Sequence, residues 1–258
     1  MDRSFLSQAM VVAASRRFVC IRLLTYESAV EAEVLKSFFI GRSGLLENTT
    51  FVLLAPDGET PLSRAGRSPA FAFQATHGQN AAEVMAGAMD AISARYEKSE
   101  GGGKTPAALP LTVDFRRGLD VAACDGLPLV VLASGDAKGQ AALAERAAAL
   151  AWSAPFVGRF AWAVGAAPAD LAKIEGASGK TGLLVVEPDA YGLTGKLLAA
   201  APADADEKTL AKALADGLSR HHPIEKDPRR HIEEGKRLGV RWKTEIPETD
   251  PGPRGGGR

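Results

Sequence analysis

One short sequence pattern occurs twice in this chain. Residues 51–58 read FVLLAPDG, and residues 183–190 read LLVVEPDA. Each copy is an apolar run of strand length that ends at Pro-Asp, where proline presets φ and the glycine of the first copy accepts a positive φ. A second short strand and then an amphipathic helix are predicted after each copy. The repetition predicts two copies of one α/β unit.

Composition and charge limit the class of protein. The chain has 258 residues, of which 46% are hydrophobic and 24% charged, so it can bury real cores in one or two domains. It carries 31 basic and 31 acidic residues. Without a sustained positive field, general nucleic-acid binding is not expected. No apolar run reaches the length of about 18 residues that suggests a membrane-spanning helix.

Glycine and proline mark the expected domain boundaries. Gly101, Gly102, Gly103 and Pro106 lie in a segment typical of a linker. Prolines also interrupt the chain after residue 222, and its last residues are PGPRGGGR. The predicted organisation is a first domain at 1–97, a linker at 98–108, a second domain at 109–222, and an extended, partly disordered tail at 223–258.

Apolar periodicity predicts the elements of both units. In the first unit we expect helices at 4–15, 28–40 and 80–96, a buried strand at 18–24, and strands at 49–55 and 62–65. Ser28 and Asn80 are predicted N-caps. In the second unit we expect strands at 111–115, 127–133, 160–164, 183–186 and 196–199, and helices at 139–152, 168–174 and 207–220. Trp152, Trp162 and Phe160 are expected in the second core.

This order of elements resembles the thioredoxin fold family, in which a β-α-β half is joined through a helix to a β-β-α half. The second unit fits that order throughout, and the first fits it from the family's second helix onward. The resemblance implies an α/β chain with two thioredoxin-like units, each a mixed sheet flanked by helices. The first unit lacks its N-terminal strands, and a Pro/Gly-rich tail follows the second.

The family's chemistry uses a C-x-x-C motif at a helix N-terminus, where the thiol pKa is lowered, and a cis-proline that faces the motif. In the second unit the motif position is Ser134–Lys138, SGDAK, and the proline position holds Thr181. In the first unit the proline position falls near Thr49, and the motif position lies before Met1. Either a strand and its motif lie upstream of Met1, or the gap is filled in another way. A genuine start would suggest the cytoplasm, and a missing upstream segment would suggest export.

The two cysteines are not arranged as a redox pair or a zinc site. Cys20 lies within the predicted strand at 18–24, so we expect a buried, inert thiol. Cys124 precedes the core strand in a segment that reads as a turn, and it is a weak candidate for a reactive thiol.

Other candidate sites are few. His221, His222 and His231 are weak candidates for metal ligands, because their spacing places them on no common helix face. Trp242, an aromatic residue in a polar tail, is predicted to dock on a domain face or a partner. The Gly-Lys-Thr triplets at 103–105 and 179–181 lack the earlier glycine of a phosphate-binding loop. No cofactor and no metal are therefore predicted.

These observations favour a non-catalytic, thioredoxin-like interaction or structural protein whose partner is a protein. The alternative is a thiol–disulfide oxidoreductase. Its redox motif would lie upstream of Met1, or it would use Cys124 alone.

Overall fold

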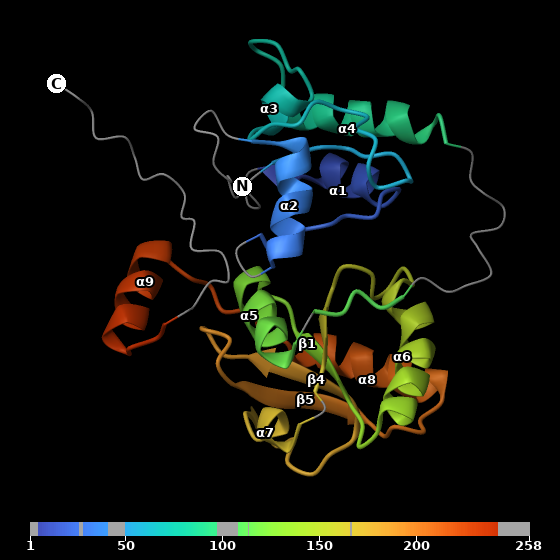
Figure 1. Cartoon of the computed structure of the whole chain (residues 1–258), viewed down its shortest axis with the longest axis vertical. Coiled ribbons are helices and arrows are strands. Elements are labelled where there is room, and N and C mark those ends of the chain that lie inside the picture. Colours follow the sequence, from blue (N-terminus) through green and yellow to red (C-terminus); the bar gives the residue numbers. More distant parts are fainter. Residues whose placement is uncertain are drawn as a thin grey trace. The chain divides into compact units, whose positions relative to one another are not determined.

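The computed structural model describes residues 5–25, 28–40, 50–96, 108–112, 114–165 and 167–241. They fall into two compact units, 5–96 (unit 1) and 108–241 (unit 2), and each is described by itself. Unit 2 contains a mixed sheet flanked by helices, which confirms the predicted α/β class (Figure 1). Within the described ranges, no helix is both long and apolar enough to cross a membrane.

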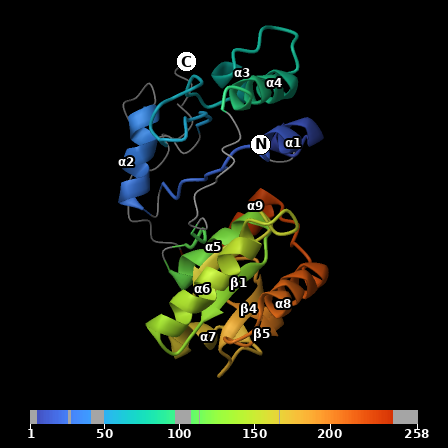
Figure 2. The same cartoon turned by 90° about the vertical axis from the view of Figure 1, so that its right-hand side faces the viewer.

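The sheet of unit 2 has five strands in the order β2-β1-β4-β5-β3. They are β1 (Leu129–Ala133), β2 (Ala161–Val164), β3 (Ile174–Glu175), β4 (Gly182–Pro188) and β5 (Gly195–Ala201). β1 is parallel to β2 and antiparallel to β4, and β4 is antiparallel to β5. β3 pairs in parallel with the start of β5. β4 therefore lies between β1 and β5, as two views show (Figures 1 and 2).

Helices cover both faces of this sheet. They are α5 (Phe115–Asp125), α6 (Ala137–Ala151), α7 (Pro168–Leu171) and α8 (Glu207–Arg220). Apolar side chains of α6 and α8 share one cluster with the sheet, and those of α5 and α7 share the other. A further helix, α9 (Pro228–Arg237), follows α8.

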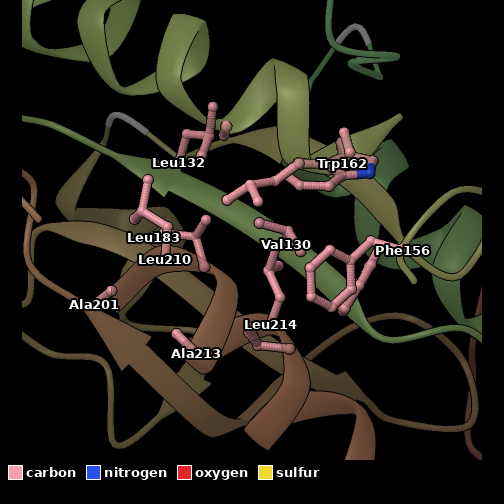
Figure 3. Packing of buried hydrophobic residues seen from close by; sticks show 14 of the residues in the cluster. Val130, Leu132, Phe156, Trp162, Leu183, Ala201, Leu210, Ala213 and Leu214 are labelled. Atoms are coloured by element: carbon pink, nitrogen blue, oxygen red, sulfur yellow. The ribbon is translucent and has the colours of Figure 1, made fainter. Parts of the chain in front are cut away.

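The central strands are apolar on both faces because each face has its own helical layer. Along β1, Val130 and Leu132 point to the α6–α8 layer, and the alternate residues point to the α5–α7 layer. Leu183 and Val185 of β4 extend the first cluster, with Leu214 of α8 packed against it (Figure 3). This alternation follows from the two-residue period of a strand.

Most predicted elements of unit 2 are confirmed. The strands at 127–133, 160–164, 183–186 and 196–199 and the helices at 139–152 and 207–220 all form, with ends shifted by a few residues. Phe160 and Trp162 are buried as expected, and their rings meet edge to face at 5.9 Å. Trp152 is 37% exposed instead, because its indole Nε1 donates to the Ala108 carbonyl at the surface.

The strand predicted at 111–115 is wrong. Among the described residues of this range, only Leu111 makes a bridge, parallel to Trp162, and α5 begins at Phe115. The reason is Asp114, whose carboxylate accepts a hydrogen bond from the Arg117 amide and caps the helix. The helix predicted at 168–174 is also shorter, because Ile174 belongs to β3.

The prediction of an extended tail from residue 223 is wrong for residues 228–237. These residues form α9, where Asp227 is the N-cap and Pro228 takes the first helical position. The described residues up to 241 belong to unit 2. Residues 242–258 lie outside the described ranges.

In the described part of unit 1, the regular elements are helices. Its helices are α1 (Ala9–Ser15), α2 (Ala29–Phe38), α3 (Pro69–Ala72) and α4 (Ala81–Ser93). Ser28 and Asn80 cap α2 and α4, as predicted. The core forms where α1 and α4 meet, around Val11, Met85 and Met89.

The strands predicted for unit 1 do not form as regular strands. Residues 18–24 are irregular, and Val19 and Ile21 are exposed. Residues 50–55 and 61–66 make a hairpin with only the isolated bridges Phe51–Gly66 and Leu54–Pro61. Strand propensity alone does not produce a ladder, because each strand needs a neighbour to receive its backbone hydrogen bonds. Thr49 lies outside the described residues.

Candidate functional site

The two Pro-Asp copies form turns built on the same contact. Asp57 accepts hydrogen bonds from the Glu59 and Thr60 amides and from the Thr60 hydroxyl, the last at 2.6 Å. Asp189 accepts from the amides of Tyr191, Leu193 and Thr194 and from the Thr194 hydroxyl, again at 2.6 Å. The repeated sequence pattern therefore encodes a carboxylate that organises a hairpin turn.

These contacts lower the pKa of both carboxyl groups. For Asp57, the Thr60 hydroxyl and the Thr60 and Glu59 amides hold the pKa below its ordinary value of 3.8. For Asp189, partial burial acts to raise the pKa, but the bonds from Thr194, Tyr191 and Leu193 together outweigh it and leave the pKa lowered. The ionised form of each aspartate is the one that stabilises its turn.

We expect Asp189→Ala to lower the free energy of unfolding of unit 2 by about 1–3 kcal/mol, because several amides lose a charged acceptor. The Asp189 contribution is present above the ordinary pKa of 3.8 and is lost as pH falls through the lower pKa of the folded state. Urea unfolding of the wild type and the variant at about pH 7 and about pH 3 measures both effects. Asp57→Ala, at an exposed turn of unit 1, is the matched control and should leave the unit 2 transition unchanged. Equal stability of wild type and Asp189→Ala at neutral pH would refute this role.

The carboxyl end of β1 carries the loop that the sequence resemblance predicts as the motif position. Ala133 of β1 pairs with Gly182 of β4 in antiparallel register. The loop Ser134–Lys138, here called the motif loop, therefore begins beside Thr181. Gly135 to Lys138 and Thr181 are exposed. The structure thus brings the two predicted positions to the same open end of the sheet.

Polar side chains of the motif loop bind backbone amides of the loop and of the first turn of α6. Asp136 is the N-cap of α6, and its carboxylate accepts the Gly139 amide at 2.7 Å. The Ser134 hydroxyl accepts the Asp136 amide at 3.4 Å. A carboxylate therefore occupies the place at the helix N-terminus where a thiolate would receive the same amide hydrogen. The loop itself, SGDAK, contains no sulfur.

The opposite end of the sheet is held by residues 221–235, whose contacts we call the tail clasp. The His221 ring bonds the Glu187 carboxylate through Nδ1 and the Gly126 carbonyl through Nε2, both at 2.9 Å. The His222 amide donates to the same Glu187 carboxylate. Both partners of the His221 ring are acceptors, so both contacts are hydrogen bonds only when the two ring nitrogens each carry a hydrogen.

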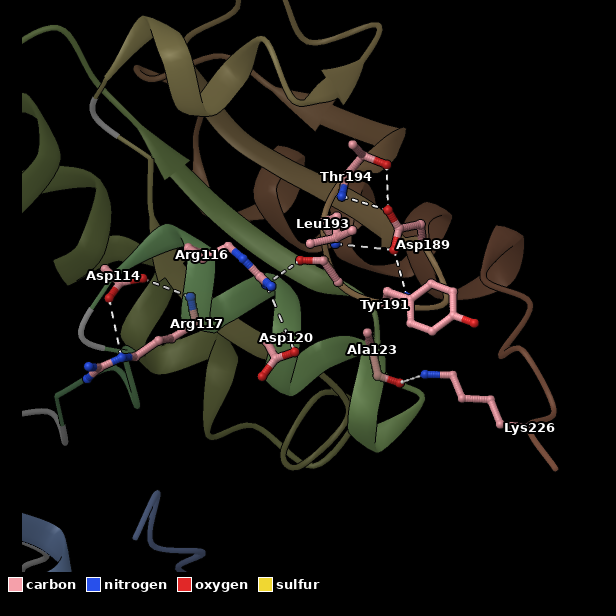
Figure 4. A network of polar contacts seen from close by, with 11 residues as sticks. Asp114, Arg116, Arg117, Asp120, Ala123, Asp189, Tyr191, Leu193, Thr194 and Lys226 are labelled. Atoms are coloured by element: carbon pink, nitrogen blue, oxygen red, sulfur yellow. Dashed lines mark hydrogen bonds and ion pairs between the residues drawn. The ribbon is translucent and has the colours of Figure 1, made fainter. Parts of the chain in front are cut away.

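The β4–β5 turn contacts both α5 and the tail clasp, as Figure 4 shows in part. Arg116 of α5 donates to the Gly192 carbonyl at 2.6 Å, and Gly192 lies directly on the α5 backbone. The Tyr191 ring stacks on His231 with centroids 4.3 Å apart, and its hydroxyl donates to the His231 carbonyl. Lys226 donates to the Ala123 carbonyl. α9 therefore lies beyond the turned end of the β4–β5 hairpin (Figure 1), and the described tail contacts the end remote from the motif loop.

The histidine candidates serve this clasp. His221 and His222 meet one carboxylate, and His231 stacks on Tyr191. Among the described residues, no group of three or more possible metal-ligating side chains comes together. Trp242, the predicted docking residue, lies outside the described residues.

Both cysteines are exposed thiols. The prediction that Cys20 is buried is wrong, because the strand expected around it does not form. Cys124 lies in the last turn of α5 and not in a turn between elements, which corrects the second prediction. α5 leads into the start of β1, and the motif loop follows its end. The ends of this five-residue strand are about 13 Å apart.

Sequence reasoning missed the tail clasp. Asp227 followed by Pro228, with Lys236 and Arg237 in the last turn, is a recognisable helix signal. Glu187 as the partner of His221 carries no such signal, because the two are 34 residues apart and meet only through the sheet.

Comparison with known proteins finds no similar protein: no family model, no curated protein and no solved structure matches the chain.

Proposed function

We propose that this chain is a non-catalytic interaction or structural protein, and that unit 2 is its thioredoxin-like module. One observation carries the proposal. At the helix N-terminus where the family places its redox cysteines, Asp136 caps α6 and takes the Gly139 amide. The position keeps the local geometry of a helix N-terminus but has no sulfur with which to exchange disulfides.

The topology of unit 2 supports the thioredoxin-like assignment. β1, α6 and β2 form a succession of strand, helix and parallel strand, α7 follows, and β4, β5 and α8 form the second half. The antiparallel pairing of β1 with β4 joins the halves. This is the order that the sequence resemblance implies. For unit 1 the support is weaker, because its described residues contain isolated bridges and no sheet, so we restrict the proposal to unit 2.

The motif loop is the contact surface we favour. Its residues from Gly135 to Lys138, and Thr181 beside them, are exposed. The other candidate is the outer edge of β5, of which β3 covers only Gly195 and Lys196. On that edge the Arg220 guanidinium already bonds the Leu198 carbonyl, which obstructs the addition of another strand.

The alternative function, a thiol–disulfide oxidoreductase that uses Cys124, rests on the exposure of this thiol. Its place in the fold is unfavourable. Cys124 lies in the last turn of α5, whereas the family's reactive thiol is placed at a helix N-terminus.

We expect the wild-type chain not to accelerate the reduction of insulin by dithiothreitol, because the motif loop has no thiol. Turbidity of the released insulin B chain measures the rate. Cys124→Ser and Cys20→Ser should behave as the wild type does. An acceleration by the wild type that disappears in either serine variant would overturn the proposal and establish the oxidoreductase.

A further inference from the structure

The segment Phe18–Leu24 of unit 1 is fixed at both ends and exposed in the middle. The Phe18 amide donates to the Ser15 carbonyl at 2.9 Å, and the Leu24 amide donates to the Glu31 carboxylate at 2.6 Å. Between these anchors, Val19 is 72% exposed and Ile21 is 74% exposed. Two large β-branched side chains are therefore exposed to solvent in a short segment whose two ends are held by hydrogen bonds.

Within this stretch, the backbone groups of Val19 and Ile21 are available for pairing. Within the described part of the chain, the amide and carbonyl groups of Val19 and Ile21 have no hydrogen-bond partner. The sequence FVCIRLL has no proline or glycine, high strand propensity and a single charge. Such a segment is a template for the addition of another strand.

We propose that the occupant is the same segment of a second copy of this chain, paired antiparallel about Cys20. In this register Val19 of each copy faces Ile21 of the other, which is a favourable pairing of β-branched side chains. In this register the two Arg22 residues do not face each other, so their like charges are not placed directly across the pair. A two-fold axis through the Cys20 pair makes the contact self-complementary.

Two further observations favour a copy of the chain over a charged partner. The formal net charge is zero, with 31 basic and 31 acidic residues, so two copies do not repel each other. α2, which packs on Leu23 through Ala32 and Leu35, leaves Val30 76% and Val34 42% exposed on its other face. Because a strand pair alone is smaller than the roughly 800 Å² per partner of a stable interface, this helix face supplies additional apolar area.

Light scattering after size exclusion, at about 1–100 µM protein, tests the inference under reducing conditions. We expect the mass of a dimer for the wild type. Val19→Lys with Ile21→Lys should weaken dimerisation at least about tenfold, because two cations would face each other across the pair. Val157→Lys, at a 43% exposed position in unit 2, is the matched control and should remain dimeric. Circular dichroism confirms that each variant folds.

Cys20 supplies an independent readout of the register. Directly opposed residues in an antiparallel pair have Cα atoms about 4.5–5.5 Å apart, which suits a disulfide. Diamide, which takes two electrons and two protons from the paired thiols, should link two copies of the Cys124→Ser variant and not of Cys20→Ser. A monomer at every concentration, or a dimer that persists in the lysine variant, would overturn the inference. A monomer with slow amide exchange at residues 19–21 would instead indicate a segment of the same chain. The inference does not depend on the role proposed for unit 2.

Discussion

Gly182→Ala is expected to destabilise unit 2 by about 4 kcal/mol, enough to unfold it at moderate urea concentrations. Gly182 begins β4 with φ of +118°, a conformation that side-chain-bearing residues rarely adopt. A Cβ at this position would overlap the Ala201 carbonyl oxygen and approach the Pro202 carbonyl carbon to 2.7 Å. Backbone strain and forced displacement each cost about 1–3 kcal/mol.

Gly179→Ala separates the two causes. Gly179 also has a positive φ, +69°, but a Cβ there would meet nothing within 4 Å. Gly179→Ala should lower the free energy of unfolding by only about 1 kcal/mol, which is the cost of the left-handed backbone conformation alone. Urea unfolding followed by circular dichroism compares the two variants. Similar losses in both would mean that the close approach of β4 to Ala201 does not determine the stability of this end of the sheet.

The second large effect is a gain of activity in Asp136→Cys with Gly139→Cys. Asp136 and Gly139 have the spacing of a C-x-x-C motif and lie on the first turn of α6. A Cβ at Gly139 would lie 3.3 Å from Asp136 Oδ2, so the two sulfur atoms would be neighbours. The Ser134 hydroxyl, 2.7 Å from the same Cβ, can rotate away or be removed with Ser134→Ala. The helix N-terminus would stabilise the first thiolate through the Gly139 amide.

The sequence predicted the parts of the fold that depend on local signals. The apolar runs of β1 and β4 are long enough to identify strands buried on both faces, and the cap residues Ser28 and Asn80 mark helix starts. The position of Asp136, between β1 and α6, could also be predicted, because both the strand and the helix have clear sequence signals.

Most errors arose where a prediction depended on distant partners. Residues 18–24 have strand propensity, but no neighbouring strand pairs with them in the described chain, so Cys20 is exposed where burial was expected. One error was local. The apolar residues at 111–115 indicate a strand, but the N-cap Asp114 starts helix α5 at Phe115 instead. The pairing of His221 with Glu187 could not be predicted, because only the folded sheet brings them together.

Insulin reduction by the double-cysteine variant tests the central claim, that unit 2 has a thioredoxin-like frame whose redox position holds no sulfur. The two thiols would take electrons from dithiothreitol and pass them to the insulin disulfides. We predict acceleration well above the wild-type rate, and none for the matched control Asp136→Ser with Gly139→Ser. If the variant folds and forms its 136–139 disulfide but does not accelerate insulin reduction, or if the wild type is equally active, the claim is contradicted.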